Sequence, residues 1–234
     1  MIIAVISCWK YRDAWKPFFA LLEKFWPDHP ETLLLTDYYD SLPELPASIR
    51  VFSGSPSPLW TWCQTLQYFA QVVVAKRHDG PLLVMQEDFF LTAPVNTYIV
   101  ERGLTEMKRH NASSVRLYPV PGADLDYGDP YFGKCSQTAP YRISCQATIW
   151  RPSFLARIAT VAGDSAMHFE VVGNRYAEEL DDTVLAFKRE ALPPNEWPLQ
   201  YLCSGISAGR WNPDSKRLFE SHGIEADYSL RAMA

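Results

Sequence analysis

Three consecutive polar residues, Gln86-Glu87-Asp88, have the residue types and position best suited to chemistry. They follow the apolar run LLVM and precede the apolar FFL, so two adjacent carboxylates stand at the end of a buried strand. Burial and mutual repulsion penalise such a pair unless a cation or hydrogen-bond donors meet it. A divalent ion held by one carboxylate, with phosphate oxygens completing its coordination, is a common solution. The alternative is an acidic turn that caps the next element.

The elements that must position this motif alternate between strand and helix. Apolar, β-branched runs predict strands at Met1–Ser7, Thr32–Leu35, Ile49–Phe52, Pro81–Met85, Val115–Tyr118, Tyr141–Ile149 and Tyr201–Ile206. Helical spacing of apolar residues predicts helices at Tyr11–Phe25, Trp60–Val74, Val95–Lys108, Pro152–Ala162 and Tyr176–Arg189. We expect a short strand or turn at His168–Val172 and a long loop at Pro119–Pro140. The alternation predicts an α/β fold, with a mostly parallel central sheet flanked by helices.

Ligands of such sheets bind outside the carboxyl ends of the strands. The polar residues at the predicted strand ends are therefore the candidates for a site: Ser7, Cys8, Asp37, Gln86, Glu87, Asp88, Arg116 and Gln146.

Composition excludes several classes. The 234 residues carry a formal charge of −5, so a nucleic-acid partner is not expected. The five cysteines contain no CxxC pair, which indicates reduced thiols in a cytoplasmic protein. No apolar run approaches the ~20 residues of a membrane span. Phosphate-loop, dinucleotide and zinc-protease motifs are absent from the sequence.

The order of these features resembles the GT-A class of nucleotide-sugar glycosyltransferases. An apolar first strand, then Arg12, Asp37 and a strand ending in Gln86-Glu87-Asp88 follow the order of that class, and LVMQEDFFL is similar to the Glu-Asp-Asp variant of inverting N-acetylglucosaminyltransferases. Downstream, Gln146–Trp150, Pro152–Ile158 and His168-Phe169-Glu170 resemble the acceptor-side strand, helix and catalytic turn. Bacterial glycosyltransferase-like proteins of polysaccharide biosynthesis have similar EDFF, RLYP, YRIS and FE segments.

The resemblance implies a role for each candidate residue. Asp88 would hold a divalent metal, Mn²⁺ or Mg²⁺, and Glu170 would be the general base of an inverting transfer. The other implied donor-site residues are Ser7, Cys8, Arg12, Asp37, Gln86, Glu87, Arg116 and Arg142. The implied acceptor-side and sugar-stacking residues are Trp60, Trp150, His168 and Arg210.

The implied function is transfer of a sugar from a UDP-linked donor to a glycan or lipid-linked acceptor, the latter requiring peripheral membrane binding. The chain would form one GT-A-like, Rossmann-like domain (1–234), with a nucleotide-sugar half (1–118) and a small acceptor-side half (119–234). One alternative is a catalytically inactive relative that binds a nucleotide or glycan. Another is a nucleotidyltransferase-like enzyme, which should have a loop rich in glycine and basic residues after the first strand. That position holds Cys8–Arg12, without glycine.

Overall fold

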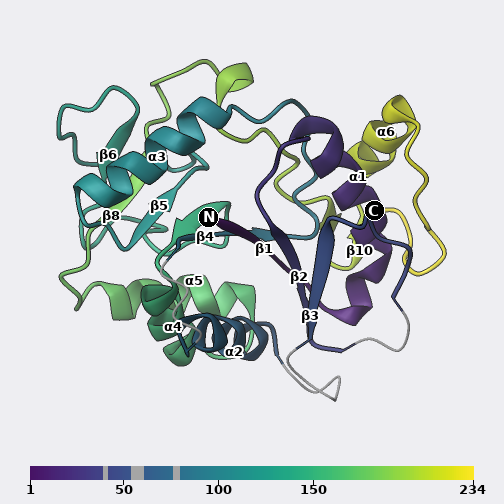
Figure 1. Cartoon of the computed structure of the whole chain (residues 1–234), viewed down its shortest axis with the longest axis horizontal. Helices are drawn as coiled ribbons and strands as arrows, with labels where there is room; N and C mark the ends of the chain where they lie inside the picture. Colours follow the sequence, from purple (N-terminus) through teal and green to yellow (C-terminus); the bar gives the residue numbers. More distant parts are fainter. Residues whose placement is uncertain (39–41, 54–60, 76–79) are drawn as a thin grey trace.

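A central sheet of eight strands runs through the computed structural model, which describes residues 1–38, 42–53, 61–75 and 80–234 (Figure 1). The strand order is β3-β2-β1-β4-β7-β5-β8-β6. The strands are β1 (Ile2–Ile6), β2 (Thr32–Thr36), β3 (Ile49–Ser53), β4 (Leu82–Gln86), β5 (Ser114–Arg116), β6 (Phe132–Lys134), β7 (Thr148–Trp150) and β8 (Val184–Phe187). Neighbours β3, β2, β1 and β4 are all parallel, and β5 is parallel to β8, whereas β7 and β6 pair antiparallel with their neighbours. The expected mostly parallel α/β sheet is confirmed.

Helices cover both faces of this sheet (Figure 1). The helices are α1 (Trp15–Phe25), α2 (Trp62–Ala75), α3 (Thr97–Arg109), α4 (Pro152–Val161), α5 (Ala166–Ala177) and α6 (Pro213–His222), with 3-10 turns η1 (Trp9–Ala14) and η2 (Pro194–Glu196). A small hairpin joins β9 (Ile206–Ser207) to β10 (Arg210–Trp211). Ile3 and Val5 of β1 pack with α1, α3 and α6, whereas Ala4 and Ile6 pack with α2, α4 and α5. Burial on both faces explains why β1 is apolar at every position.

The order of the strands places a crossover point beside β1. The chain runs outward from β1 through β2 to β3, then returns to the opposite side of β1 with β4. Crevices at such points, outside the carboxyl ends of the strands, are the usual ligand sites of doubly wound sheets. Ser7 follows β1, and Glu87 follows β4, at this position.

Two predicted elements beyond β4 are wrong. His168–Val172 lies within α5, and the predicted helix Tyr176–Arg189 is mostly replaced by a turn and by β8. Four acidic residues between Ala177 and Thr183 would repel one another on a continued helix, while all four residues of β8 are buried, as a central strand requires. The helix α6 was not predicted.

The predicted strand Tyr141–Ile149 is shortened to its last two residues, which begin β7. Side chains of α5 replace the missing strand ladder. Asn174 accepts a hydrogen bond from the Ile143 amide (2.9 Å) and donates one to its carbonyl (2.8 Å). The predicted strand Tyr201–Ile206 is reduced to one isolated bridge, Tyr201 with Leu91, and the start of β9.

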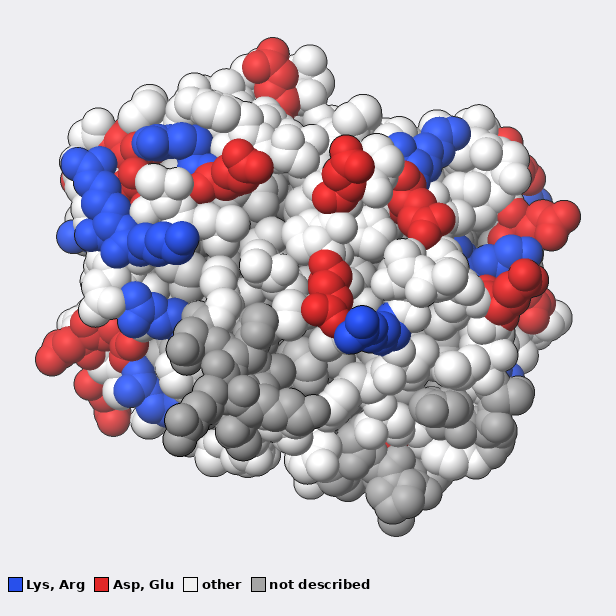
Figure 2. Space-filling model, viewed as in Figure 1, with Lys and Arg blue, Asp and Glu red and all other residues white. Residues whose placement is uncertain are grey.

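Basic and acidic side chains are interspersed on the face shown in Figure 2. Within the described residues, no helix has the length and apolar character needed to cross a membrane.

Candidate functional site

A cavity of about 580 Å³ lies at the carboxyl ends of β1, β2 and β4. Its first wall is formed by residues that follow these three strands: Ser7, Cys8, Tyr11, Asp37, Gln86, Glu87, Asp88 and Phe89. Its second wall comes from α2, α5 and the loops before β7 and β9: Trp62, Thr65, Cys145, Gln146, Asp164, Ser165, Ala166, Met167, Glu170, Cys203, Ser204 and Ile206. The cavity therefore occupies the crossover point of the sheet.

Asp37, after β2, is held by three donors on one oxygen. Its Oδ1 accepts hydrogen bonds from the backbone amides of Trp9 and Tyr38, each 2.8 Å long, and from the Thr36 hydroxyl at 3.1 Å. The side chain is thereby fixed, and it joins the end of β2 to the turn that follows β1.

The motif Gln86-Glu87-Asp88 begins at the last residue of β4. The chain turns here, and a 3.2 Å hydrogen bond from the Phe89 amide to the Gln86 carbonyl closes the turn. Two bonds from the segment before β9 hold Asp88. The Gly205 amide donates to its carbonyl oxygen (3.0 Å), and the Ile206 amide donates to Oδ2 (3.2 Å). Only glycine permits this approach, because a Cβ on Gly205 would lie 2.1 Å from Phe90 Cε2.

The surroundings of Glu87 and Asp88 disfavour the ionised form of both carboxylates. Burial, and then the charge of Asp88, raises the pKa of Glu87, which is 7% exposed, well above its usual value. Burial raises the pKa of Asp88 from 3.8 to about 6. Among the residues that the structure describes, no Lys, Arg or His lines the cavity. An anionic ligand would therefore meet carboxylates and no basic side chain among these described lining residues.

Glu170 faces the same cavity from α5. Its Oε1 accepts hydrogen bonds from the Ser144 hydroxyl (3.1 Å) and the Cys145 amide (2.8 Å). Gln146 is also fixed, because its Oε1 accepts a 2.8 Å bond from the Tyr201 hydroxyl. The structure thus brings together eight predicted site residues, Ser7, Cys8, Asp37, Gln86, Glu87, Asp88, Gln146 and Glu170. Their individual roles stay predictions.

The predicted arginine clamps do not line the cavity. Arg116, 1% exposed, donates to the carbonyl oxygens of Tyr141 (2.5 Å), Pro121 (2.5 Å) and Gly122 (3.2 Å). Arg142 donates to the carbonyls of Cys135 (2.8 Å) and Ser136 (3.0 Å) and also to that of Asp182. Both guanidinium groups hold loops in place through backbone carbonyls, and neither residue lines the cavity.

Arg12 and Arg210 are also directed elsewhere. Arg12 lies over the Trp9 ring, 4.5 Å from its centroid, and borders a different groove with Leu42 and Leu230. Arg210 is exposed and donates to the Met233 carbonyl at 3.2 Å.

The predicted sugar-side residues are not gathered either. Trp150 is in the core, packed against Phe154 and Phe169, and His168 is exposed on α5 outside the cavity wall. Trp60 lies outside the described residues.

Sequence reasoning missed two residues of the cavity region. Tyr11 lines the first wall, although it was placed only within a predicted helix. Arg231 lies behind this wall and lowers the pKa of both Glu87 and Asp88 against the effect of burial. No local sequence signal marks Arg231, since its partner Asp13 is 218 residues away.

Two of the thiols that line the cavity, those of Cys8 and Cys145, are not suited to nucleophilic chemistry. Burial raises the pKa of Cys8 to about 12 and that of Cys145 well above its usual value, so both are protonated near neutral pH. All five cysteines are free.

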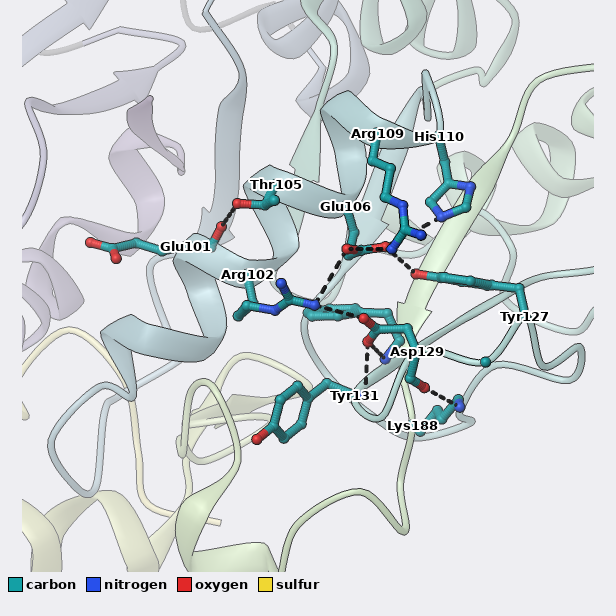
Figure 3. A network of polar contacts seen from close by, with 12 residues as sticks. Glu101, Arg102, Thr105, Glu106, Arg109, His110, Tyr127, Asp129, Tyr131 and Lys188 are labelled. Carbon is teal, nitrogen blue, oxygen red and sulfur yellow. Dashed lines mark hydrogen bonds and ion pairs between the residues drawn. The ribbon is translucent and has the colours of Figure 1, made fainter.

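A second buried polar network lies on α3 and the loop before β6, outside the cavity lining (Figure 3). Glu106 accepts hydrogen bonds from Tyr127 (3.1 Å) and Arg102 (3.4 Å). Arg102 also donates to Asp129 at 2.7 Å, and Asp129 Oδ1 accepts the amides of Tyr131 and Phe132. With its charges paired, this network has the features of a structural support for the loop before β6.

The cavity carboxylates have the chemistry to bind a divalent ion. In the described part of the chain, no group of three or more His, Cys, Asp or Glu side chains is placed to hold a metal. Magnesium, however, is commonly held by one or two carboxylates together with water and substrate phosphates. Glu87 and Asp88 fit this mode, because both border the cavity and Ile206 occupies only one oxygen of Asp88.

Comparison with known proteins gives no match to a family model and none to a curated protein. Among solved structures, the chain is similar to bifunctional IspDF from Campylobacter jejuni, with 10% identity and a TM-score of 0.43. The match covers 86% of this chain and 51% of that one, so the chain spans about half the length of IspDF. The A197 protein from STIV matches at 13% identity, 80% of each chain and a TM-score of 0.42. A 4-diphosphocytidyl-2C-methyl-D-erythritol synthase matches at 12% identity, 74% of this chain, 84% of that one and a TM-score of 0.41.

These findings correct the family and function expected from the sequence. The similar structures are titled as IspDF, as A197 and as a 4-diphosphocytidyl-2C-methyl-D-erythritol synthase, not as glycosyltransferases of polysaccharide biosynthesis. The predicted membership of the glycosyltransferases is therefore wrong, and so is the predicted sugar transfer to a glycan or lipid-linked acceptor. The alternative of an inactive nucleotide or glycan binder gains no support. The motifs are short, and their order was a poor guide to the family. That order reflects an α/β sheet with polar strand ends, and proteins of many different chemistries share such a sheet.

Proposed function

We propose that the chain is a nucleotide-binding enzyme that uses a divalent cation to transfer a nucleotidyl group. The observation that carries the proposal is the pair Glu87-Asp88, placed at the crossover point of the sheet in a cavity with no basic side chain among its described lining residues. A phosphate chain could approach this pair only with a cation between them.

The cation would be held by Asp88 and Glu87 and would neutralise charge on the phosphate oxygens. Asp88 is suited to this role because the Ile206 amide fixes its Oδ2 and leaves the other oxygen available. Asp37, fixed through Oδ1 at the neighbouring strand end, would accept a hydrogen bond from the nucleoside through Oδ2.

In the proposed reaction, an acceptor oxygen attacks the α-phosphorus of a nucleoside triphosphate. The bond from the α-phosphorus to the oxygen that bridges to the β-phosphate breaks, and pyrophosphate leaves with that oxygen. The proton of the acceptor hydroxyl passes to a carboxylate, and Glu170, which lines the cavity on the second wall, is the proposed base.

The proposal is tested by thermal denaturation with each of the four ribonucleoside triphosphates, with Mg²⁺ or with EDTA. A ligand at a hundredfold excess over its Kd stabilises the folded protein by about 2.7 kcal/mol. For a chain of this length, that raises the Tm by about 5–10 °C. We expect this shift with Mg²⁺ only, and we expect Asp88→Asn to abolish it. Glu101→Gln, at an exposed carboxylate on α3, is the matched control and should keep it.

Two outcomes would contradict the proposal. A lack of any shift, or an equal shift in EDTA, would show that these carboxylates do not bind a metal–nucleotide complex. A third outcome would come from the products of slow turnover, measured with water or an added alcohol as the acceptor. Pyrophosphate and orthophosphate are assayed separately. Release of orthophosphate alone would assign attack at the γ-phosphorus and reject nucleotidyl transfer.

A further inference from the structure

The segment after α6 returns to the cavity and buries an arginine behind it. The backbone of residues 231–234 pairs with β10, with the Trp211 amide donating to the Ala232 carbonyl and the Ala234 amide to the Trp211 carbonyl, both at 2.9 Å. This pairing directs Arg231, 8% exposed, toward η1, the turn that follows β1. A charged side chain so deeply buried needs a specific set of partners.

Its hydrogen-bond partners all belong to η1, and its guanidinium carbon also lies 5.8 Å from the centroid of the Trp211 ring on β10. The guanidinium of Arg231 binds both oxygens of Asp13, with Nε–Oδ2 and Nη2–Oδ1 distances of 2.6 and 2.7 Å. Nη2 also donates to the Lys10 carbonyl at 2.7 Å. One arginine thus fixes both ends of the stretch that contains Tyr11.

Tyr11 itself lies between Arg231 and the cavity. The guanidinium carbon is 4.4 Å from the centroid of the Tyr11 ring, and the same ring lines the cavity beside Cys8 and Asp37. Its backbone (φ −108°, ψ 18°) departs from the helical values of its neighbours, so η1 bends at this residue. Arg231 contacts this ring from outside η1.

Fold stability alone explains this arrangement poorly. A buried ion pair usually stabilises a fold no more than apolar residues of the same size would. Here the pair is built against a cavity wall and supports an aromatic ring on that wall. Aromatic rings of this kind bind nucleobases by stacking.

We propose that Arg231 is a positioning residue that holds Tyr11 in place for the nucleoside part of the ligand. The inference rests on the proposed function, since it assumes that the cavity binds a nucleotide. It assigns the phosphates to the Glu87-Asp88 side and the nucleoside to the side formed by Tyr11 and Asp37. Arg231 touches neither part directly.

The test compares two ligands that share the phosphate chain and differ in the nucleoside. Calorimetric titrations with Mg²⁺ use the nucleoside triphosphate that binds best and inorganic tripolyphosphate. The variants are Tyr11→Leu and the double variant Asp13→Asn/Arg231→Met, which avoids leaving Asp13 buried without its partner. Arg210→Met, an exposed arginine on β10, the strand that pairs with residues 231–234, is the control. Arg231→Lys tests whether charge without the bidentate fork is sufficient.

We expect both Tyr11→Leu and the double variant to weaken nucleotide binding about tenfold or more and to leave tripolyphosphate binding unchanged. We expect Arg210→Met to behave as wild type and Arg231→Lys to recover only part of the lost affinity. Equal weakening for both ligands, or no change for either, would overturn the positioning role. If the wild type binds neither ligand, the proposed function fails, and this inference fails with it.

Discussion

Asp88→Asn should stabilise the protein while it abolishes the binding of a metal–nucleotide complex. Asp88 is the centre of the proposed site, and burial raises its pKa from 3.8 to about 6. At 1.36 kcal/mol per pH unit, this difference corresponds to about 3 kcal/mol of unfavourable free energy in the ionised native state. Asparagine keeps an acceptor for the Ile206 amide and removes the charge, so the penalty disappears.

The pH dependence follows from the direction of the change. The native state binds the Asp88 proton more tightly than the unfolded chain does. The free energy of unfolding of the wild type therefore falls as the pH rises from about 4 to about 6, and it remains lower above that range. Glu87, whose pKa is also raised, contributes in the same direction. Asp88→Asn removes most of this fall, so the gain over wild type is absent near pH 4 and complete at pH 8.

The assay is thermal unfolding of wild type and variant between pH 4 and pH 8, without nucleotide and with EDTA. For 234 residues, about 3 kcal/mol corresponds to an increase in Tm of roughly 6–12 °C at pH 8. This is an upper value, since water in the cavity screens the charge. Glu101→Gln controls for the loss of a carboxylate at an exposed position. A variant no more stable than wild type at pH 8 would refute the reasoning that these carboxylates are held against an electrostatic penalty.

Four further substitutions test how the site and the fold are built, with urea unfolding as the measurement. Gly205→Ala should lower the free energy of unfolding by about 3 kcal/mol, because its Cβ would overlap the fully buried Phe90 ring. Gly209→Ala should lower it by only about 1 kcal/mol, because a positive φ without a clash is its sole penalty. Arg116→Met should lower the free energy of unfolding by about 3 kcal/mol, because it leaves three carbonyl oxygens without their donor. The Mg²⁺-dependent shift in Tm with nucleotide should persist in this variant. Loss of that shift in a folded variant would indicate that Arg116 is a phosphate ligand after all. Trp150→Ala should cost about 3–5 kcal/mol through lost packing, and a cost below 1 kcal/mol would contradict its place in the core.

The strands β1, β2 and β4 could be predicted from the sequence because each is buried strongly enough to leave a plain apolar run. Once those runs are known, a parallel sheet brings their carboxyl ends to one edge, and Asp37 and Glu87 must then lie close to Ser7. This geometric step, rather than the family resemblance, is what located the cavity. The same step could not place Arg116 or Arg142, because a loop can fold back over an arginine and satisfy it with carbonyl oxygens. Nothing in the residue type distinguishes that role from phosphate binding.

The parts that sequence reasoning missed depend on contacts between distant residues. The division into a donor half (1–118) and an acceptor half (119–234) separates groups that the structure joins. Asp88 is held through its carbonyl by Gly205 and through its carboxylate by Ile206. Asp13, in the turn after β1, is paired with Arg231. Because the C-terminal segment fixes both the acidic motif and the turn beside it, its movement would alter the two sides of the cavity together. A ligand that contacts both sides would therefore also stabilise residues 205–234, which links binding in the cavity to the order of the C-terminal segment.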